Sequence, residues 1–116
     1  MNVITLNTRR HPRRTVEIPV AIQIGDSVVQ GTARDLGPGG SFIEPEDGYI
    51  AGEFVHGAEV LEFLRDGQDV KISISGGLGY EFCPSLAEIR WTGYSAAHRC
   101  HGFGIQWKID QVRLAA

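Results

Sequence analysis

The sequence predicts a single, mainly β domain in which about six short strands form a small antiparallel barrel or sandwich. Its 116 residues match the commonest size of one domain and leave little room for a second. Hydrophobic residues make up 42% of the chain, which is enough to bury a core and to exclude general disorder. The 15 glycines, spread among short apolar runs, are typical of strands joined by tight turns.

The first part of the chain predicts three strands. Residues 16–24 read Val-Glu-Ile-Pro-Val-Ala-Ile-Gln-Ile, and this strict alternation of apolar positions indicates a half-buried strand. Pro19 falls on the opposite face, which places the strand near an edge or a corner of the sheet. A Gly-Asp turn leads to a returning strand at residues 28–36. A glycine- and proline-rich break then precedes a short third strand at residues 41–43.

The rest of the chain is less regular. Residues 44–57 are acidic and contain glycines, so they are expected to form a loop. Residues 58–65 fit a short helix, although a strand is nearly as defensible for so short an apolar run. Alternation predicts three further strands, at residues 70–75, 86–91 and 103–109, with a turn at 76–79 and a polar loop at 92–101. Four large aromatic side chains are in phase with apolar neighbours and are therefore expected in the core: Phe42, Trp91, Phe103 and Trp107.

Charge is distributed unevenly along the chain. The net formal charge of −3 argues against a generally basic nucleic-acid-binding protein. Residues 1–14 contain four arginines and no acid and so carry +4, which leaves −7 on the remaining 102 residues, with acids concentrated in residues 44–66. A solvated basic tail and a local anion site both fit this pattern. The use of arginine rather than lysine counts toward an anion site, because the guanidinium group binds phosphate bidentately and stacks on bases.

The sequence also argues against several classes of protein. No uncharged apolar stretch approaches the roughly 18 residues of a membrane helix, and the N-terminus does not resemble a secretory signal, so a cytoplasmic protein is expected. Cys83 and Cys100 are then expected to be free thiols. The best candidates for a catalytic or metal site are Cys83 and the run from His98 to His101, but their spacing matches no usual zinc pattern. Loop histidines and a small buried thiol explain them better, so we expect no enzyme, no cofactor and no metal.

Two segments combine into a candidate site. Residues 9–14 read Arg-Arg-His-Pro-Arg-Arg before the first strand, and residues 35–40 read Asp-Leu-Gly-Pro-Gly-Gly after the second. The start of one strand and the end of the next are neighbours in a hairpin, so the two segments can flank one ligand. Arginine forks pair with phosphate or with guanine O6 and N7, and a carboxylate accepts from guanine N1–H and N2–H₂. A glycine loop lets the ligand approach the backbone closely.

With these residues the chain resembles the PilZ domain, the bacterial receptor module for cyclic di-GMP. The family pattern is Arg-x-x-x-Arg followed by Asp/Asn-x-Ser-x-x-Gly, and here Arg9-x-x-x-Arg13 is followed after 21 residues by Asp35-x-x-x-x-Gly40. The likeness spans roughly residues 9–110 and includes the closing Gly-Phe-Gly-Ile-Gln-Trp. It implies a six-stranded antiparallel split barrel with at most one or two short helices, which agrees with the strand count.

The resemblance implies roles for the four arginines. Arg9 and Arg13 would hold the guanine and the phosphates of cyclic di-GMP. Arg10 and Arg14 form a second, overlapping pair that could add phosphate contacts. His11 lies between them and is better explained as a solvated loop residue.

The resemblance also implies roles in the second segment, with one departure from the family. Asp35 would hydrogen-bond a guanine edge, Gly40 would keep the loop tight against the ligand, and Gly39 belongs to the same loop. The family serine is Gly37 here. Loss of that hydroxyl would cost about 0.5–1.5 kcal/mol of binding free energy if it contacts the ligand. The charged contacts remain, so we expect binding, although weakened.

The expected function is therefore a cyclic di-GMP-binding signalling module that changes its surface on binding and acts through a protein partner in motility, biofilm or virulence control. The alternative is a degenerate adaptor that binds a protein with little nucleotide affinity. Neither reading involves nucleic acid or membrane insertion. The expected organisation is a flexible arginine-rich arm at 1–15, a barrel at 16–110 with an acidic insertion at about 44–67, and a tail at 111–116. The insertion is longer than the family needs, which marks it as a candidate partner surface.

Overall fold

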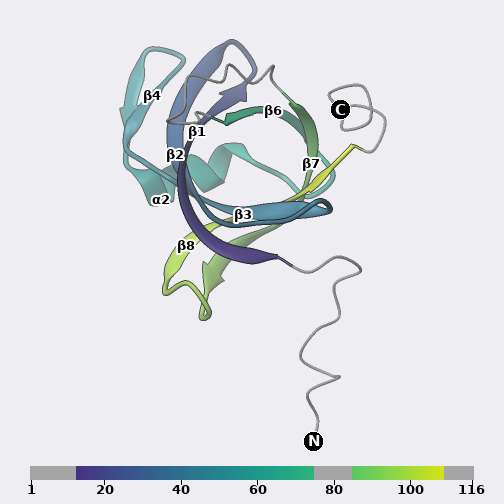
Figure 1. Ribbon diagram of the computed structural model, residues 1–116. Helices are drawn as coiled ribbons and strands as arrows, with labels where there is room; N and C mark the ends of the chain where they lie inside the picture. The colour runs from purple at the N-terminus through teal and green to yellow at the C-terminus, as the bar shows by residue number, and fades with distance from the viewer. Residues whose placement is uncertain (1–12, 75–84, 109–116) are drawn as a thin grey trace, which may run out of the picture.

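A computed structural model describes residues 13–74 and 85–108, and within these ranges six strands close into an antiparallel barrel (Figure 1). The predicted six-stranded barrel is confirmed. The barrel strands are β1 (Arg14–Ile24), β2 (Ser27–Leu36), β3 (Gly40–Pro45), β6 (Asp69–Ile74), β7 (Ser85–Ser95) and β8 (Cys100–Trp107). Arg9, Arg10, His11, Cys83, the expected turn at 76–79 and the tail from 109 lie outside the described residues.

The order of strands around the barrel is β1-β2-β3-β8-β7-β6. β1, β2 and β3 follow one another as hairpins, and so do β6, β7 and β8. Two pairings join these halves: residues 40–43 of β3 pair with residues 103–106 of β8, and residues 20–23 of β1 pair with residues 71–74 of β6. The barrel therefore brings the start of β3 beside the end of β8, more than sixty residues away in sequence.

Alternating apolar residues from every barrel strand meet inside it. Residues such as Ile22, Ile43, Ile89 and Ile105 are fully buried and belong to one cluster. Each side chain of this size contributes about 1.5–3 kcal/mol when it is removed from water. Phe103 and Trp107 lie in this cluster, as predicted.

The prediction that residues 44–57 form a loop is wrong. The segment contains a two-stranded hairpin, β4 (Gly48–Ile50) and β5 (Glu53–Val55), joined by Ala51 and Gly52, whose φ angles of 53° and 85° are both positive. Two-residue turns with positive φ at both positions commonly join hairpin strands, but they usually contain Asn, Asp or Gly. Alanine at the first position therefore gave no signal for a hairpin. The helix expected at 58–65 is present as α2 (Gly57–Val60), continued by the 3₁₀ turn η1 (Leu61–Phe63).

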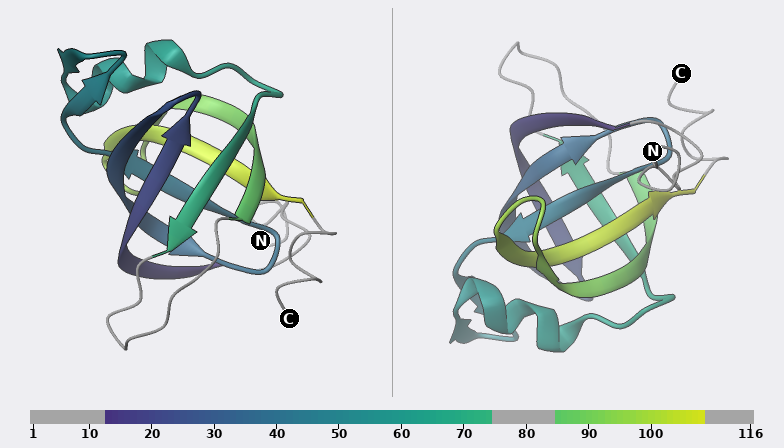
Figure 2. Two further views of the ribbon diagram at one scale, coloured as in Figure 1. Left: turned by 90° about the horizontal axis from the view of Figure 1, so that it is seen from above. Right: turned by 90° about the horizontal axis from the view of Figure 1, so that it is seen from below.

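The segment from β4 to η1, called the insert below, lies across one end of the barrel (Figure 2). Ile50 and Val60 are buried and join the core cluster, which anchors the insert to the barrel. Asp47, the residue before the insert, is linked to the start of α2, because its Oδ1 accepts a hydrogen bond from the Gly57 backbone N–H at 2.7 Å. The loop between β2 and β3, residues 37–39, lies at the other end of the barrel.

The prediction of a polar loop at residues 92–101 is also wrong. β7 runs on to Ser95 and β8 starts at Cys100, so that most of this stretch is paired strand. A β-bulge between Ile89 and Trp91 breaks the alternation on which the prediction relied. Trp91 is therefore turned out of the core, with 38% of its surface exposed, which corrects its expected place inside.

No helix within the described ranges has the length and apolar character that crossing a membrane requires.

Candidate functional site

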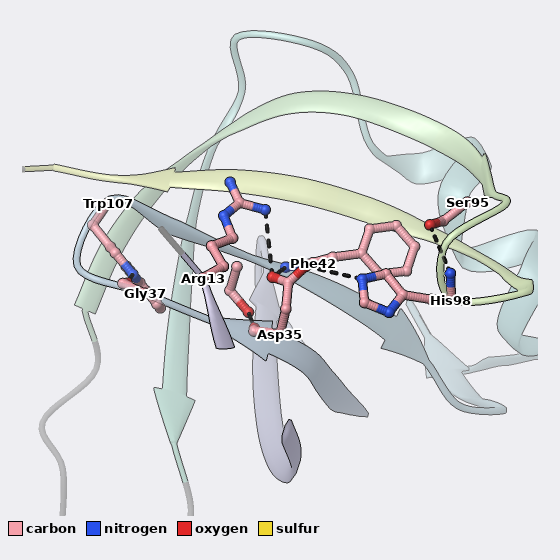
Figure 3. A network of polar contacts seen from close by, with 8 residues as sticks. Arg13, Asp35, Gly37, Phe42, Ser95, His98 and Trp107 are labelled. Carbon is pink, nitrogen blue, oxygen red and sulfur yellow. Dashed lines mark hydrogen bonds and ion pairs between the residues drawn. The ribbon is translucent and has the colours of Figure 1, made fainter. Parts of the chain in front are cut away.

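The carboxylate of Asp35 stands at the centre of a polar network near the end of β2 (Figure 3). Its Oδ1 accepts a hydrogen bond from the Phe42 backbone N–H at 2.8 Å and faces Arg13 Nη1 at 3.4 Å. Its Oδ2 lies 2.9 Å from His98 Nε2. Asp35 is only 4% exposed, so these partners replace the water that a carboxylate otherwise needs.

A β-bulge puts Asp35 in this position. Ala33 pairs with Ile43, but Asp35 pairs with Phe42, because the register between β2 and β3 shifts at Arg34. Ile43 faces the core, so its neighbour Phe42 faces out of the barrel, and the shift brings Asp35 to the same outer face. A regular strand would not bring Asp35 and Phe42 together in this way.

Three aromatic rings cover this outer face. Phe42 stacks against Trp91 with ring centroids 5.3 Å apart and against His98 at 5.0 Å. Glycines on β8 make room for the rings: a Cβ on Gly102 would lie 2.6 Å from the Phe42 ring, and one on Gly104 would lie 2.4 Å from the Trp91 indole nitrogen. Phe42 is thus buried as predicted, although it belongs to this stack and not to the core cluster.

The turn between β7 and β8 carries His98 to Asp35. The Ser95 Oγ accepts a hydrogen bond from the His98 backbone N–H at 3.2 Å, and the Ser95 carbonyl accepts one from Arg99 at 2.7 Å. His98 does lie in a turn, as expected, but its side chain is only 14% exposed and belongs to the site. Sequence reasoning missed it because 63 residues separate it from Asp35 and no motif links the two.

The loop at residues 37–39 is closed and tied to β8. The Gly37 N–H donates to the Gly40 carbonyl at 3.0 Å, and the Trp107 indole N–H donates to the Gly37 carbonyl at 3.1 Å. The Trp107 backbone N–H donates to the Gly39 carbonyl at 3.0 Å. The loop is thus held at both ends, and Trp107 has a polar role that its expected place in the core did not suggest.

Gly40 has no room for a side chain. A Cβ at this position would lie 2.1 Å from the Ile105 carbonyl oxygen and 2.8 Å from Arg13 Nη2. Glycine is therefore required where β3 meets β8 and where the Arg13 guanidinium group lies over the backbone.

The two described arginines of the first segment serve different places. Arg13 reaches Asp35 on the outer face, whereas Arg14 lies at a half-open groove of about 500 Å³ at the barrel end opposite the insert. Apolar side chains line much of this groove, among them Ile18, Leu36 and Trp107. Of the predicted site residues, the structure brings Arg13, Asp35, Gly37, Gly39 and Gly40 together, with Arg14 beside them at the groove.

Cys100 lies apart from this network. Burial raises the pKa of its thiol, the Glu44 carboxylate raises it further, and Arg34 opposes the rise. Among residues 13–74 and 85–108, no group of three or more His, Cys, Asp or Glu side chains is arranged to hold a metal ion.

The fold and the site together define a small β-barrel domain with an arginine–carboxylate pair beside a glycine loop. The family model of the PilZ domain matches residues 7–114, so the chain belongs to the PilZ domain family. The domains of this family are non-catalytic receptors for cyclic di-GMP.

Two solved structures show the same fold at low sequence identity. The PilZ domain of YcgR from Escherichia coli, solved with cyclic di-GMP, is 14% identical with a TM-score of 0.61, and the match covers 94% of this chain and 86% of that one. The inhibitor of motility (MotI/DgrA) of Bacillus subtilis is 12% identical with a TM-score of 0.59, and the match covers 94% of this chain but only 50% of that protein. A comparison with curated proteins gives no match.

Proposed function

We propose that this domain binds cyclic di-GMP at the outer face formed by Arg13, Asp35 and the loop at residues 37–39. The observation that carries the proposal is the Arg13–Asp35 pair, 3.4 Å apart beside Gly40, where the two motif segments meet. A guanidinium group can bind a phosphodiester or the guanine O6 and N7. The carboxylate can accept hydrogen bonds from the guanine N1–H and N2–H₂.

Binding would exchange one partner of Asp35. A carboxylate has about four acceptor positions, and here Phe42, Arg13 and His98 use three of them. The contact to Arg13 is the longest of the three. When Arg13 turns to the ligand, a position on Oδ1 becomes available beside the one that Oδ2 already has, and guanine presents two adjacent donors that match them.

The other arginines would complete the anion site. Arg14 lies beside the groove at the same end of the barrel as the glycine loop. We propose that it, together with Arg9 and Arg10, contacts the phosphates. A cyclic dinucleotide carries two negative charges, and bidentate arginine contacts give such a ligand both affinity and orientation.

Gly37 lacks the hydroxyl of the family serine, and this departure counts only in part against the proposed binding. The loop is already held by Trp107 through the carbonyl groups of Gly37 and Gly39. A hydroxyl that merely shaped the loop would thus be replaced, whereas one that touched the ligand would be lost.

Output would pass to a protein partner in the cytoplasm, and motility control is one such output. The insert offers a surface for it, because Tyr49 and Phe54 are 64% and 52% exposed and their rings pack edge to face, 5.6 Å apart. Exposed carboxylates lie nearby in the sequence, including Glu46 and Glu53, so a partner segment with basic and apolar residues would fit. The alternative function is an adaptor that uses this surface without the nucleotide.

The test is isothermal titration of the full chain with cyclic di-GMP, with GTP as the ligand control. We expect saturable binding of the cyclic dinucleotide. Arg13→Ala and Asp35→Ala should each weaken binding at least about tenfold, because each removes a charge-assisted contact. Arg65→Ala is the matched control, since Arg65 is an exposed arginine in the chain that follows the insert.

Thermal unfolding of each variant separates loss of the site from loss of the fold. Added cyclic di-GMP should raise the midpoint of the wild type, as any ligand of the native state does. Absence of both heat and midpoint shift at high ligand concentration would reject the nucleotide function and leave the adaptor. Equal affinities for the Arg65 and Arg13 variants would reject the site.

A further inference from the structure

We infer that His98 is a positioning residue that holds the Asp35 carboxylate in the plane needed to read guanine. This inference rests on the proposed function. It adds to the site a residue from the turn between β7 and β8, a part of the chain that neither motif segment includes.

The distances show which partners fix Asp35. The Phe42 N–H lies 2.8 Å from Oδ1 and His98 Nε2 lies 2.9 Å from Oδ2, whereas Arg13 is 3.4 Å away. An ionised carboxylate only accepts hydrogen bonds, so Nε2 must carry the hydrogen. One donor on each oxygen, from β3 and from the β7–β8 turn, defines the plane of the carboxylate without help from the arginine.

His98 is itself held in place. Its ring stacks on Phe42 with 11° between the planes, and its backbone N–H donates to Ser95 Oγ. The side chain is 14% exposed. A side chain fixed in this way loses little further freedom on binding, so it can orient its neighbour at low entropic cost.

The consequence concerns the moment at which Arg13 turns to the ligand. Asp35 would then keep both short contacts and present one vacant acceptor position on each oxygen. Guanine fills both with N1–H and N2–H₂, whereas hypoxanthine lacks the 2-amino group and fills one. His98 should therefore matter for the discrimination between these bases as well as for affinity.

The test compares three variants of the full chain by titration with cyclic di-GMP and with its inosine analogue. His98→Phe keeps a ring to stack on Phe42 but removes the donor, and His98→Gln restores a donor. His101→Phe is the matched control, because the His101 ring packs on Tyr94 and the residue is exposed. Thermal unfolding without ligand checks the fold of each protein.

We expect His98→Phe to weaken cyclic di-GMP about tenfold and the inosine analogue about threefold or less, since one charged hydrogen bond is lost. His98→Gln should recover most of the affinity, and His101→Phe should match the wild type. In an Asp35→Asn background, His98→Phe should change affinity less than twofold, because residues that act through one another are not additive.

Three results of the main comparison would overturn the inference. Wild-type affinity in a folded His98→Phe protein rejects the role of His98 and leaves the proposed function intact. An equal loss of affinity for cyclic di-GMP and for its inosine analogue would show that His98 does not affect recognition of the guanine 2-amino group. If the wild type binds neither ligand, the proposed function fails and the inference fails with it. Should His98→Phe not fold, the ligand ratio of His98→Gln decides, with an unchanged ratio and reduced affinity counting against the inference.

Discussion

Asp35 shows how a charged side chain can be buried with hydrogen-bond partners on both of its oxygens. It is 4% exposed, yet a backbone N–H, an imidazole and a guanidinium group all face its two oxygens. Its own carbonyl also accepts a hydrogen bond from Ser41 Oγ. Within the described residues, no buried side-chain nitrogen or oxygen lacks a partner. The carboxylate is therefore held in place by the protein alone, and the proposed exchange with cyclic di-GMP removes only the longest of these contacts.

Gly40 gives the sharpest prediction at the scale of one residue. Gly40→Ala should lower the free energy of unfolding by about 1–3 kcal/mol or more, because the new Cβ would meet the Ile105 carbonyl oxygen and backbone cannot easily move aside. The measurement is urea denaturation. Gly48→Ala is the control: its Cβ would lie 3.5 Å from Val29, an ordinary contact, so a change within about 0.5 kcal/mol is expected. Equal stability of the two variants would contradict the tight junction of β3 and β8.

At the scale of elements, the loop at residues 37–39 depends on β8. Trp107 donates its indole N–H to Gly37 and its backbone N–H to Gly39, so the last barrel strand shapes a loop that lies seventy residues earlier in the sequence. Apart from the hydrogen bond between Gly37 and Gly40, the loop has little to fix it, because two of its three residues are glycines, whose backbone is permissive. The loop at residues 37–39 and the core are thus linked through one tryptophan.

Trp107→Phe tests this link. The substitution keeps an aromatic ring in the core but removes the donor to Gly37, so we expect a loss of about 1 kcal/mol in the free energy of unfolding. Cyclic di-GMP should bind about threefold to tenfold more weakly, because the loop is no longer preformed. Trp91→Phe is the control, since it shrinks an indole that is 38% exposed and keeps the stack on Phe42. An unchanged dissociation constant in Trp107→Phe would show that the loop needs no tie to β8.

At the scale of the whole molecule, the barrel separates two surfaces. The glycine loop lies at one end and the insert crosses the other (Figure 2). The closed barrel lies between the loop and the insert. The proposed nucleotide site and the proposed partner surface should therefore be separable by mutation.

The double variant Tyr49→Ser/Phe54→Ser tests that separation. Both side chains are exposed on the β4–β5 hairpin, so their removal should leave the fold intact and the dissociation constant for cyclic di-GMP within twofold of the wild type. Titration measures the second effect, and thermal unfolding checks the first. A large loss of nucleotide affinity would mean that the insert belongs to the ligand site.

The sequence alone was enough to predict the barrel and the motif pair. Both predictions rest on local features: strict alternation in β1, glycine-rich breaks and two motif segments at fixed spacing. Features of this kind can be read directly from the order of residues. The same reasoning failed where the backbone departs from regular geometry. The bulge at Ile89/Trp91 turned Trp91 outward, and the turn at Ala51 concealed a hairpin.

The meeting of Arg13 with Asp35 could be predicted because the two residues flank one hairpin. The contributions of His98 and Trp107 could not, because His98 lies in the turn before β8 and Trp107 lies at the end of β8, and both reach the site only when β3 pairs with β8. Sequence by itself determined the family, the barrel and the charged groups of the candidate site. The tertiary structure decided which partners fix the Asp35 carboxylate and the loop at residues 37–39. Closure of the barrel brings hydrogen-bond donors from distant parts of the chain to both.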